Sequence, residues 1–445
     1  MKKVWFSYEN TGGLSPADFQ LGMRFLVPEV ERLQEAVRVG GYATDYASVN
    51  LSTDVQMLEK VRLVIDAKKV LRPTALVVIG IGGSHLGTLA VQQALLGTQY
   101  NAQQPNLKIY YVDSVDADYT YDVYLLVEQE LQQGHQVIIN VISKSGSTTE
   151  TIANFMVFEH LIKQYYPQTY REAVVVTTDY DSPLWELAQQ EEFDCLDIPQ
   201  RVGGRYSVFS PVGLFPLGLL NIDLEMLLAG AAHVVAPCTS MTVSDNPAAL
   251  SALLLKEHYF SGKSIHDTFL CSVDLAGFGL WYRQLMAESV GKMYDRDGGL
   301  VRIGMLPTIS LATADLHSVA QLYLGGPLNR FTTFVTVEKN KANLIVPYDT
   351  KQKVLTVLER QLQKKTYHEL MQAIVEGVQM AYLKQEMPFV TFSIPEKTAY
   401  YLGQLMQIKM FEIIYLGFLL DINPFDQPEI ELYKQETRKI LSHEE

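Results

Sequence analysis

Short apolar runs alternate with amphipathic stretches through the first half of the chain. The runs are rich in Val and Ile, as at residues 137–142, and each is too short to be a buried helix. Helical patterns separate the runs, which predicts strand–helix–strand units with parallel strands and helices on both faces of a sheet. The predicted strands of this first group are residues 75–81, 109–112, 137–142 and 173–178.

A second alternating group follows an apolar crossover at residues 214–232. Its predicted strands are 268–273, 331–337 and 389–394, and long helical patterns occupy 354–383 and 399–420. The first 65 residues show helical spacing without strong strand signals, with an amphipathic helix at 29–37 after Pro28. We therefore expect an α/β protein with two doubly wound parallel-sheet domains. The predicted division is a helical arm (1–65), a smaller first domain (66–210), a larger second domain (211–405) and a helical C-terminal segment (406–445).

Composition and charge restrict the function classes. The 445 residues are 48% hydrophobic, which excludes a disordered chain. Lys and Arg number 36 against 50 Asp and Glu, giving a net charge of −14. This acidic balance argues against a nucleic-acid partner, because the phosphate backbone attracts clustered cations. An anionic ligand would need a site that is locally positive or built from backbone N–H groups.

Cysteine usage and the apolar segments bear on the compartment. Cys195, Cys238 and Cys271 are widely spaced without any Cys-x-x-Cys pair, which is typical of free thiols in a reducing cytosol. The N-terminus turns polar too early for a signal peptide. The most apolar segments, 214–222 and 411–420, are interrupted or bounded by acidic residues, which argues against a membrane span. We expect a cytoplasmic protein with no membrane partner.

A glycine-rich turn follows the first predicted strand. The run Gly-Ile-Gly-Gly-Ser-His-Leu-Gly at 80–87 leads into a predicted helix at 88–95. A dinucleotide-binding fingerprint would need glycine where His85 stands, and a P-loop would need Gly-Lys-Ser/Thr. Both nucleotide interpretations therefore fail. The remaining alternatives are a small anion site at a strand's carboxyl end and a tight turn that binds nothing.

A hydroxyl-rich run after the third strand favours the anion site. Residues 143–150 read Ser-Lys-Ser-Gly-Ser-Thr-Thr-Glu and precede a predicted helix that extends to Ile162. Ser147 and Glu150 have capping-box spacing, so helix initiation accounts for part of this pattern. Capping does not require so many hydroxyl groups, whereas a phosphate dianion binds to several small donors at a helix N-terminus. Lys144 either adds positive charge to this site or points into solvent.

These two runs belong to a set of six segments that resembles the glucose-6-phosphate isomerase family, which has the sugar isomerase (SIS) fold. The other segments begin with Gly-Gly-Arg-Tyr-Ser at 203–207 and Gln-Leu-Met-Ala-Glu-Ser-Val-Gly-Lys at 284–292. Asp-Leu-His-Ser follows at 315–318, and Asp-Ile-Asn-Pro-Phe-Asp-Gln-Pro-Glu-Ile-Glu-Leu-Tyr-Lys occupies 421–434. The six segments occur in the family's order and extend from Gly80 to Lys434. The resemblance implies the interconversion of glucose 6-phosphate and fructose 6-phosphate through an enediol intermediate, without a cofactor.

The resemblance also implies roles for individual residues. Glu288 matches the base that transfers a proton between C2 and C1, and a positioned carboxylate suits that task. Arg205 matches the cation that stabilises the enediolate. His317 matches the ring-opening group, contributed from the neighbouring subunit of a homodimer, and Lys434 matches a lysine beside the ring oxygen. The implied substrate- and phosphate-binding residues are Gly83, Ser84, Ser143, Lys144, Ser145, Thr148, Gln284 and Gln427.

Three positions depart from the family's pattern. Gln200 replaces an acidic or small polar residue, Val290 replaces Glu or Asn, and Glu429 replaces a glycine. Glu429 adds negative charge near Lys434 in sequence, so we expect it to affect the loop geometry and the pKa of Lys434.

Two other functions remain open at this point. One is an isomerase of another sugar phosphate on the same fold, because specificity between epimers depends on fine placement of groups around C2. The other is a sugar-phosphate sensor without catalysis, which should lack Glu288, His317 and Lys434. The histidines are scattered singly with no His-Glu-x-x-His pair, so we expect no metal site.

Overall fold

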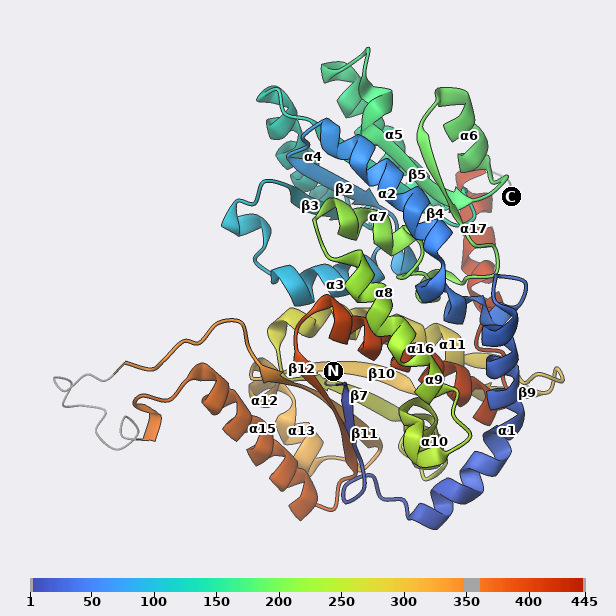
Figure 1. Cartoon of the computed structure of the whole chain (residues 1–445), viewed down its shortest axis with the longest axis vertical. Helices are drawn as coiled ribbons and strands as arrows, with labels where there is room; N and C mark the ends of the chain where they lie inside the picture. Colours follow the sequence, from blue (N-terminus) through green and yellow to red (C-terminus); the bar gives the residue numbers. More distant parts are fainter. Residues whose placement is uncertain (1–2, 348–360, 443–445) are drawn as a thin grey trace.

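The computed structural model describes residues 3–347 and 361–442 and places two five-stranded sheets one above the other along the long axis of the molecule (Figure 1). The upper sheet has the strand order β3-β2-β4-β5-β6, and all of its strands are parallel. Its strands are β2 (Ala75–Ile79), β3 (Lys108–Val112), β4 (Val137–Ser143), β5 (Val174–Asp179) and β6 (Asp194–Ile198).

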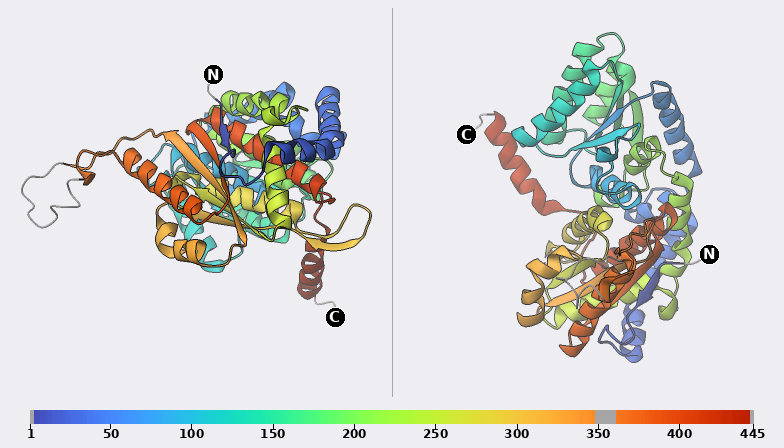
Figure 2. Two further views of the ribbon diagram at one scale, coloured as in Figure 1. Left: turned by 90° about the horizontal axis from the view of Figure 1, so that it is seen from below. Right: turned by 90° about the vertical axis from the view of Figure 1, so that its left-hand side faces the viewer.

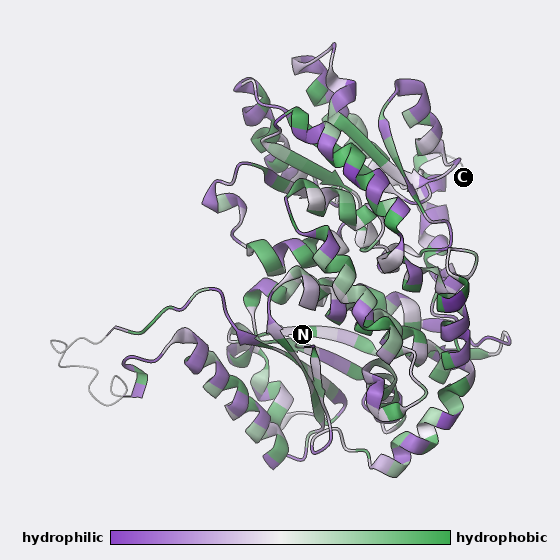
Figure 3. Ribbon diagram, viewed as in Figure 1, coloured by the Kyte–Doolittle hydropathy of each residue, from purple (hydrophilic) through white to green (hydrophobic). Residues whose placement is uncertain are grey.

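The central strands of the upper sheet are buried on both faces. Every residue of β2 and β4 is buried, which explains why these strands are continuous apolar runs rather than alternating patterns. Figure 3 shows the same strands as a hydrophobic layer between helices whose outer faces are hydrophilic. The covering helices are α2 (Val55–Val70), α3 (Leu86–Leu96), α4 (Ala117–Gln132), α5 (Thr149–Tyr165), α6 (Pro183–Glu191) and α7 (Pro211–Leu219).

The lower sheet has the order β1-β12-β11-β7-β10. Four of its strands are parallel, whereas β1 pairs with β12 in the antiparallel direction, with Trp5 opposite Ser393. Its strands are β1 (Trp5–Ser7), β7 (Ile265–Leu270), β10 (Leu306–Leu311), β11 (Arg330–Lys339) and β12 (Phe389–Glu396). The α/β class with parallel sheets is confirmed. The prediction of helical structure alone in the first 65 residues was wrong at β1, because three residues are too short to show a pattern.

Long helices complete the lower layer. Helix α1 (Pro16–Val39) starts at a capping box made by Ser15 and Asp18, and it contains Pro28, which the sequence had placed just before a shorter helix. Helix α16 (Ala399–Leu419) is long and apolar enough to cross a membrane, but 89% of its most apolar window is buried within the protein. This burial is typical of a helix in the core of a protein. The remaining long helices of this layer are α8 (Leu224–His233), α10 (Pro247–Phe260), α11 (Ala276–Val290) and α15 (Tyr367–Lys384).

Some elements were not predicted from the sequence. Strands β6 and β10 were missed, as was the short hairpin of β8 (Lys292–Tyr294) and β9 (Leu300–Ile303). Part of the predicted helix at 354–383 lies outside the described residues, and α15 accounts for its second half. The boundaries of the four predicted parts, 1–65, 66–210, 211–405 and 406–445, stay predictions.

The chain ends in a helix with no buried residue. Helix α17 (Glu431–Ser442) leaves the body of the molecule and extends alongside the upper layer (Figure 2). Leu432, Tyr433, Ile440 and Leu441 are all exposed on it. This helix carries Lys434, so its position decides whether that lysine belongs to a site.

Candidate active site

The strand order of the upper sheet determines where a ligand would bind. If these five strands are numbered 1 to 5 as they follow one another in the sequence, their order across the sheet is 2-1-3-4-5. This is a common doubly wound arrangement. The chain leaves β2 and β4 in opposite directions, and ligands bind in the crevice beyond the carboxyl ends of such a strand pair. Both candidate phosphate loops follow these two strands. The topology therefore brings together two segments about 60 residues apart in sequence.

The turn after β2 lies very close to the segment that carries Arg205. Gly82 has a φ of +60°, and a Cβ added to it would lie 2.7 Å from Nε2 of Gln284. A Cβ on Gly83 would lie 2.2 Å from the carbonyl carbon of Gly204. No larger residue can stand at position 83 without separating these two backbones, so the glycines are required by packing whether or not a ligand binds.

The loop between β4 and α5 leaves donors available. Ser143 and Thr148 hydrogen bond to each other through their hydroxyl oxygens, 3.0 Å apart. Thr148 is the N-cap residue of α5, but its side chain does not cap the helix, and the predicted capping box of Ser147 and Glu150 was wrong. Ser147 bonds instead to Oγ of Ser145, 3.3 Å away. The first-turn N–H groups of α5 have no acceptor within the helix, and they can bind an anion.

Lys144 is held inside the protein rather than exposed to solvent. Its Nζ donates hydrogen bonds to the carbonyl oxygens of Gln200 (2.7 Å) and Val202 (2.9 Å). Burial lowers the pKa of Lys144, and the nearby Asp179 carboxylate opposes this effect. Lys144 thus ties the loop after β4 to the chain that enters Gly203, Gly204 and Arg205. The departure at Gln200 does not affect this contact, because only its backbone is used.

Helix α11 supplies two side chains one turn apart. Gln284 donates through Nε2 to Oε1 of Glu288 at 2.9 Å, as expected for residues four apart on one helix face. The Oε1 atom of Gln284 is buried and has no hydrogen-bond partner within the described residues. The Glu288 side chain is 29% exposed, so a small molecule can reach the carboxylate. On this helix turn, Oε1 of Glu288 is therefore already hydrogen bonded, whereas Oε1 of Gln284 remains available as an acceptor.

Arg205 lies opposite Glu288 and is almost fully buried. Its Nη1 is 3.2 Å from Oε2 of Glu288 and also donates to Oε1 of Gln427. Its Nε donates to Oγ of Ser289 at 2.7 Å. Its Nη2 donates to the carbonyl oxygens of Pro424 (2.6 Å) and Asp426 (3.0 Å). These contacts orient the guanidinium group and attach the 424–427 loop to the end of α11.

A buried lysine that the sequence analysis did not single out completes this junction. Nζ of Lys292 donates to the carbonyl oxygen of Glu288 at 3.0 Å and forms an ion pair with Asp426, also at 3.0 Å. Burial lowers the pKa of Lys292, whereas Asp426 raises it. Ser289 and Lys292 both stand in the segment that carried the resemblance. A helix end followed by glycine and lysine was the available signal, because such a lysine can bind the last free carbonyl groups.

The other two departures have local explanations. Val290 is fully buried, so an apolar side chain suits its position. Glu429 accepts a hydrogen bond from the backbone N–H of Met293 at 3.1 Å. Lys434 bonds instead to Glu431, with Nζ 2.8 Å from Oε1. Glu429 therefore attaches the 424–430 loop to β8, and the expected influence on Lys434 is not found in these contacts.

Two predicted site residues do not join the cluster within one chain. Neither His317, on α12 (Ala314–Ser318), nor Lys434 contacts Glu288 or Arg205 within the described part of the chain. His317 is exposed and follows the carboxyl end of β10, which is parallel to β7. Helix α11 begins at that same edge and runs back along β10, so Glu288 lies about 18 Å along it at 1.5 Å per residue. The backbone topology separates the two side chains.

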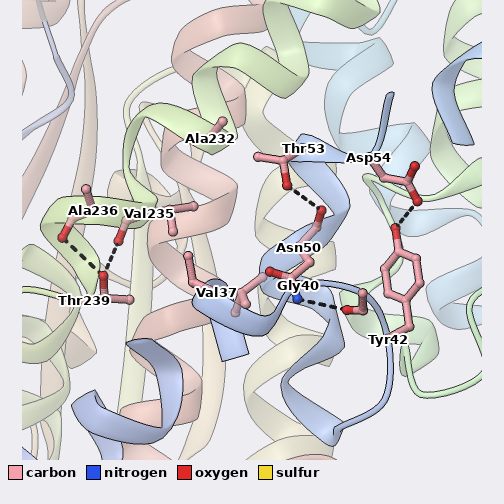
Figure 4. Close-up of a pocket in the computed structure, with 12 residues that line it drawn as sticks. Val37, Gly40, Tyr42, Asn50, Thr53, Asp54, Ala232, Val235, Ala236 and Thr239 are labelled. Carbon is pink, nitrogen blue, oxygen red and sulfur yellow. Dashed lines mark hydrogen bonds between the residues drawn. The ribbon is translucent and has the colours of Figure 1, made fainter. Parts of the chain in front are cut away.

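The protein also has a hollow away from this cluster. The hollow in Figure 4, about 640 Å³, lies between α1 and the 232–239 region. The Tyr42 hydroxyl donates to Asp54 at 2.7 Å, and the side chains of Asn50, Thr53 and Thr239 bond to backbone carbonyl groups. Over residues 3–347 and 361–442, no three His, Cys, Asp or Glu side chains gather in a way that could hold a metal ion.

Comparison with known proteins identifies the family. The family model for phosphoglucose isomerase matches residues 56–445. A glucose-6-phosphate isomerase of Carboxydothermus hydrogenoformans is 34% identical over 83% of this chain and 79% of its own length. A solved structure of a hypothetical protein from Thermus thermophilus has a TM-score of 0.85 at 29% identity and covers 98% of this chain and 99% of its own.

A second solved structure agrees in fold. The glucose-6-phosphate isomerase of Chlamydia trachomatis has a TM-score of 0.82 at 21% identity, and the match covers 98% of this chain and 88% of that one. The sequence match extends over the turn after β2, the loop after β4, α11 and the C-terminal loop, which are the segments that build the Arg205–Glu288 cluster. The chain belongs to the phosphoglucose isomerase family.

Proposed function

We propose that the Arg205–Glu288 cluster catalyses the reaction named by the relatives, the reversible isomerisation of glucose 6-phosphate and fructose 6-phosphate. The observation that carries this proposal is an accessible carboxylate held 3.2 Å from a buried, fully oriented guanidinium group. Aldose–ketose isomerisation needs a group that moves a proton between C2 and C1 and a fixed cation near the developing negative charge. This pair provides both groups beside the switch point of a parallel sheet.

In this proposal Glu288 is the base and Arg205 stabilises the enediolate. Oε2 of Glu288 removes the proton from C2 and returns it to C1, while Gln284 holds the other carboxylate oxygen. The guanidinium group of Arg205 cannot turn, because its Nε and Nη2 already bond to Ser289 and to two backbone carbonyl groups. A cation oriented before the reaction stabilises developing charge without the cost of reorganisation.

The substrate phosphate would bind to the two loops at the carboxyl ends of β2 and β4. Gly83 allows close approach, and Ser84, Ser143, Ser145 and Thr148 supply small hydroxyl donors next to the N-terminus of α5. Lys144 adds positive charge at this end, although its ammonium group already bonds to two carbonyl oxygens. Gln427 accepts a hydrogen bond from the same Nη1 atom of Arg205 as Glu288 does, and it would contact the substrate from the 424–427 loop.

His317 would complete the site from a second subunit. Within one chain the fold keeps this exposed histidine far from Glu288, so ring opening by His317 requires a homodimer in which α12 of one protomer reaches the cluster of its partner. Histidine is suited to this step because it can donate and accept a proton near neutral pH. Lys434 would act beside the ring oxygen, and α17 must then bend towards the cluster or pack against the partner subunit.

The proposal includes a cytoplasmic protein that acts in glycolysis and gluconeogenesis on a phosphorylated hexose, without a cofactor, metal, nucleic-acid or membrane partner. An isomerase of another sugar phosphate remains the alternative, because specificity between epimers depends on the fine placement of groups around C2. The sensor hypothesis is weaker, since a binding protein has no need for the pairing of Glu288 with Arg205.

The test is a coupled assay of the purified protein with glucose 6-phosphate and mannose 6-phosphate side by side, in the presence of excess chelator. We expect turnover of glucose 6-phosphate with a kcat/KM at least tenfold higher than that for mannose 6-phosphate. Turnover of mannose 6-phosphate alone would identify the alternative isomerase. Binding of both sugar phosphates without turnover of either would support the sensor.

A further inference from the structure

Arg330, on the lower sheet, is a buried cation for which the described residues provide no hydrogen-bond acceptor. It is the first residue of β11 and is 9% exposed. Its Nε is buried and unpartnered, and no residue in the described ranges accepts a hydrogen bond from its guanidinium group. The group lies over the ring of Tyr323, with Cζ 3.7 Å from the ring centroid. A guanidinium group has five N–H donors, so a buried one is ordinarily paired.

The nearby carboxylate does not neutralise this arginine. Oδ1 of Asp267 accepts hydrogen bonds from Thr308 (2.7 Å) and Ser310 (3.0 Å), and the two residues form no ion pair in the described structure. Burial raises the pKa of Asp267 despite the positive charge of Arg330. Oδ1 of Asp267 is thus bonded to hydroxyl groups, and no ion pair among the described residues balances the charge of Arg330.

Arg330 lines a pocket of about 250 Å³ at the amino-terminal edge of β11 and β12. Arg330, His258 and Met387 are the buried members of its lining. The apolar part of its lining consists of Pro327, Leu328, Met387 and Pro388, and the pocket is open to solvent. The lining residues are Gly13, His258, Lys263, Pro327, Leu328, Arg330, Glu386, Met387 and Pro388. None of these residues belongs to the Arg205–Glu288 cluster.

The charges around the pocket favour a ligand with a single negative charge. Burial lowers the pKa of His258 to about 4, and its Nε2 is bonded to the carbonyl oxygen of Gly12 at 2.7 Å, so this histidine is neutral at pH 7. Two other lining residues, Lys263 and the exposed Glu386, carry opposite charges, so together they add no net charge to the pocket. The remaining charge is the single cation of Arg330. A dianion such as phosphate would be neutralised only in part by this single cation.

We propose that this pocket binds a small aliphatic monocarboxylate, whose carboxylate group pairs with Arg330 and whose carbon chain lies against Pro327, Met387 and Pro388. The planar guanidinium fork matches a carboxylate in a two-bond geometry. A cavity of about 150 Å³ holds benzene, so 250 Å³ is sufficient for a ligand of roughly ten non-hydrogen atoms. The ligand supplies the acceptors that the protein itself does not provide for Arg330.

The test is calorimetric titration of the full-length protein with pentanoate, with the neutral pentanamide as the matched ligand control. Arg330→Met removes the charge at similar length, and Arg24→Met removes an exposed arginine of α1 as the matched protein control. We expect pentanoate to bind the unmodified protein and the Arg24→Met variant equally. The dissociation constant should rise at least tenfold in Arg330→Met, and pentanamide should bind the unmodified protein at least tenfold more weakly than pentanoate.

A second measurement guards against an unfolded variant. Thermal unfolding of Arg330→Met without ligand should occur at the same temperature as that of the unmodified protein or higher, because the variant removes an unpaired buried charge. Pentanoate should raise the unfolding temperature of the unmodified protein and not that of the variant. Equal binding of pentanoate by both proteins would overturn the proposal. Binding of inorganic phosphate in place of pentanoate at Arg330 would also overturn it.

Discussion

Arg205 and Glu288 form an ion pair whose two members differ in exposure. Nη1 of Arg205 is 3.2 Å from Oε2 of Glu288, yet the arginine side chain is 1% exposed and the glutamate side chain 29%. The cation is thus fixed by the protein, whereas the carboxylate remains open to a ligand. The bonds from Arg205 to Ser289, Pro424 and Asp426 do not involve Glu288, so they can persist while a substrate binds beside the carboxylate.

Replacing the carboxylate tests its role as a base. Glu288→Gln keeps the size of the side chain and one of its two acceptor oxygens, but it cannot accept the C2 proton. We expect kcat to fall by about 10²–10⁴-fold, the usual contribution of a positioned base. The dissociation constant for the sugar phosphate should change by less than about threefold. Exchange of the C2 hydrogen of glucose 6-phosphate into deuterated water, followed by NMR, measures the chemical step directly. Glu59→Gln, on the exposed face of α2, is the control, and appreciable exchange by Glu288→Gln would exclude this base.

Replacing the cation should affect both catalysis and stability. In Arg205→Met the carbonyl group of Pro424 keeps only the long bond from the Tyr206 hydroxyl (3.4 Å), whereas that of Asp426 keeps the bond from Lys292, so we expect a total cost of about 1–3 kcal/mol. The loss of charge stabilisation should lower kcat/KM by about 10²–10³-fold. Arg201→Met, which removes only an exposed ion pair with Asp45, should cost less than about 1 kcal/mol. Chemical denaturation and steady-state kinetics of the two variants separate these effects, and equal behaviour of both would contradict the assigned contacts.

Mixing two inactive variants tests whether the site is shared. Glu288→Gln lacks the base and His317→Ala lacks the ring-opening group, so each homodimer should be inactive in a ring-opening assay. In a hybrid dimer, one of the two sites would combine the intact Glu288 of the His317→Ala protomer with the intact His317 of the Glu288→Gln protomer. The other site would carry both substitutions. Differently tagged protomers, refolded together and purified through both tags, should regain up to half of the normal activity per dimer. Full inactivity of verified hybrids would place His317 outside the partner's site.

A half-buried carboxylate behind the loop after β4 gives the stability a pH dependence. Burial raises the pKa of Asp179 to about 6, and the positive charge of Lys144 opposes this rise only in part. Between the ordinary value near 3.9 and about 6, the folded state binds more protons than the unfolded state. Its contribution to stability is therefore favourable at low pH and is lost as the pH rises through this window. Urea denaturation at a series of pH values should show that Asp179→Asn gains stability relative to the unmodified protein from pH 4 to 6. A constant difference would contradict the raised pKa.

Local pattern was sufficient for every strand of the upper sheet except β6, and for the loops that follow β2 and β4. Continuous apolar runs such as β4 are unambiguous, because both faces are buried. Strand β10 was missed because its buried positions are separated by partly exposed ones, and β1 exists only through its pairing with β12. Pairings of this kind depend on residues far apart in sequence, which no local window contains.

Most residues of the candidate site could be named from the sequence, but the contacts between them could not. The residues that gather around Arg205 came from the resemblance, whereas the roles of Ser289 and Lys292 required the three-dimensional contacts. Lys144 illustrates the difference. A lysine in a phosphate loop suggested a charge directed at the ligand or at solvent, and its ammonium group instead bonds to two backbone carbonyl groups of another segment.

The contact between Gly83 and Gly204 makes the two halves of the candidate site one rigid piece. A Cβ on Gly83 would lie only 2.2 Å from the backbone of Gly204, so the turn after β2 cannot slide relative to Arg205. The spacing between the phosphate-binding turn and the enediolate-binding cation is then a constant of the backbone. Such a site discriminates between sugar phosphates by the length of the carbon chain between the phosphate and the carbonyl group. It should therefore bind a pentose phosphate more weakly than an epimeric hexose phosphate.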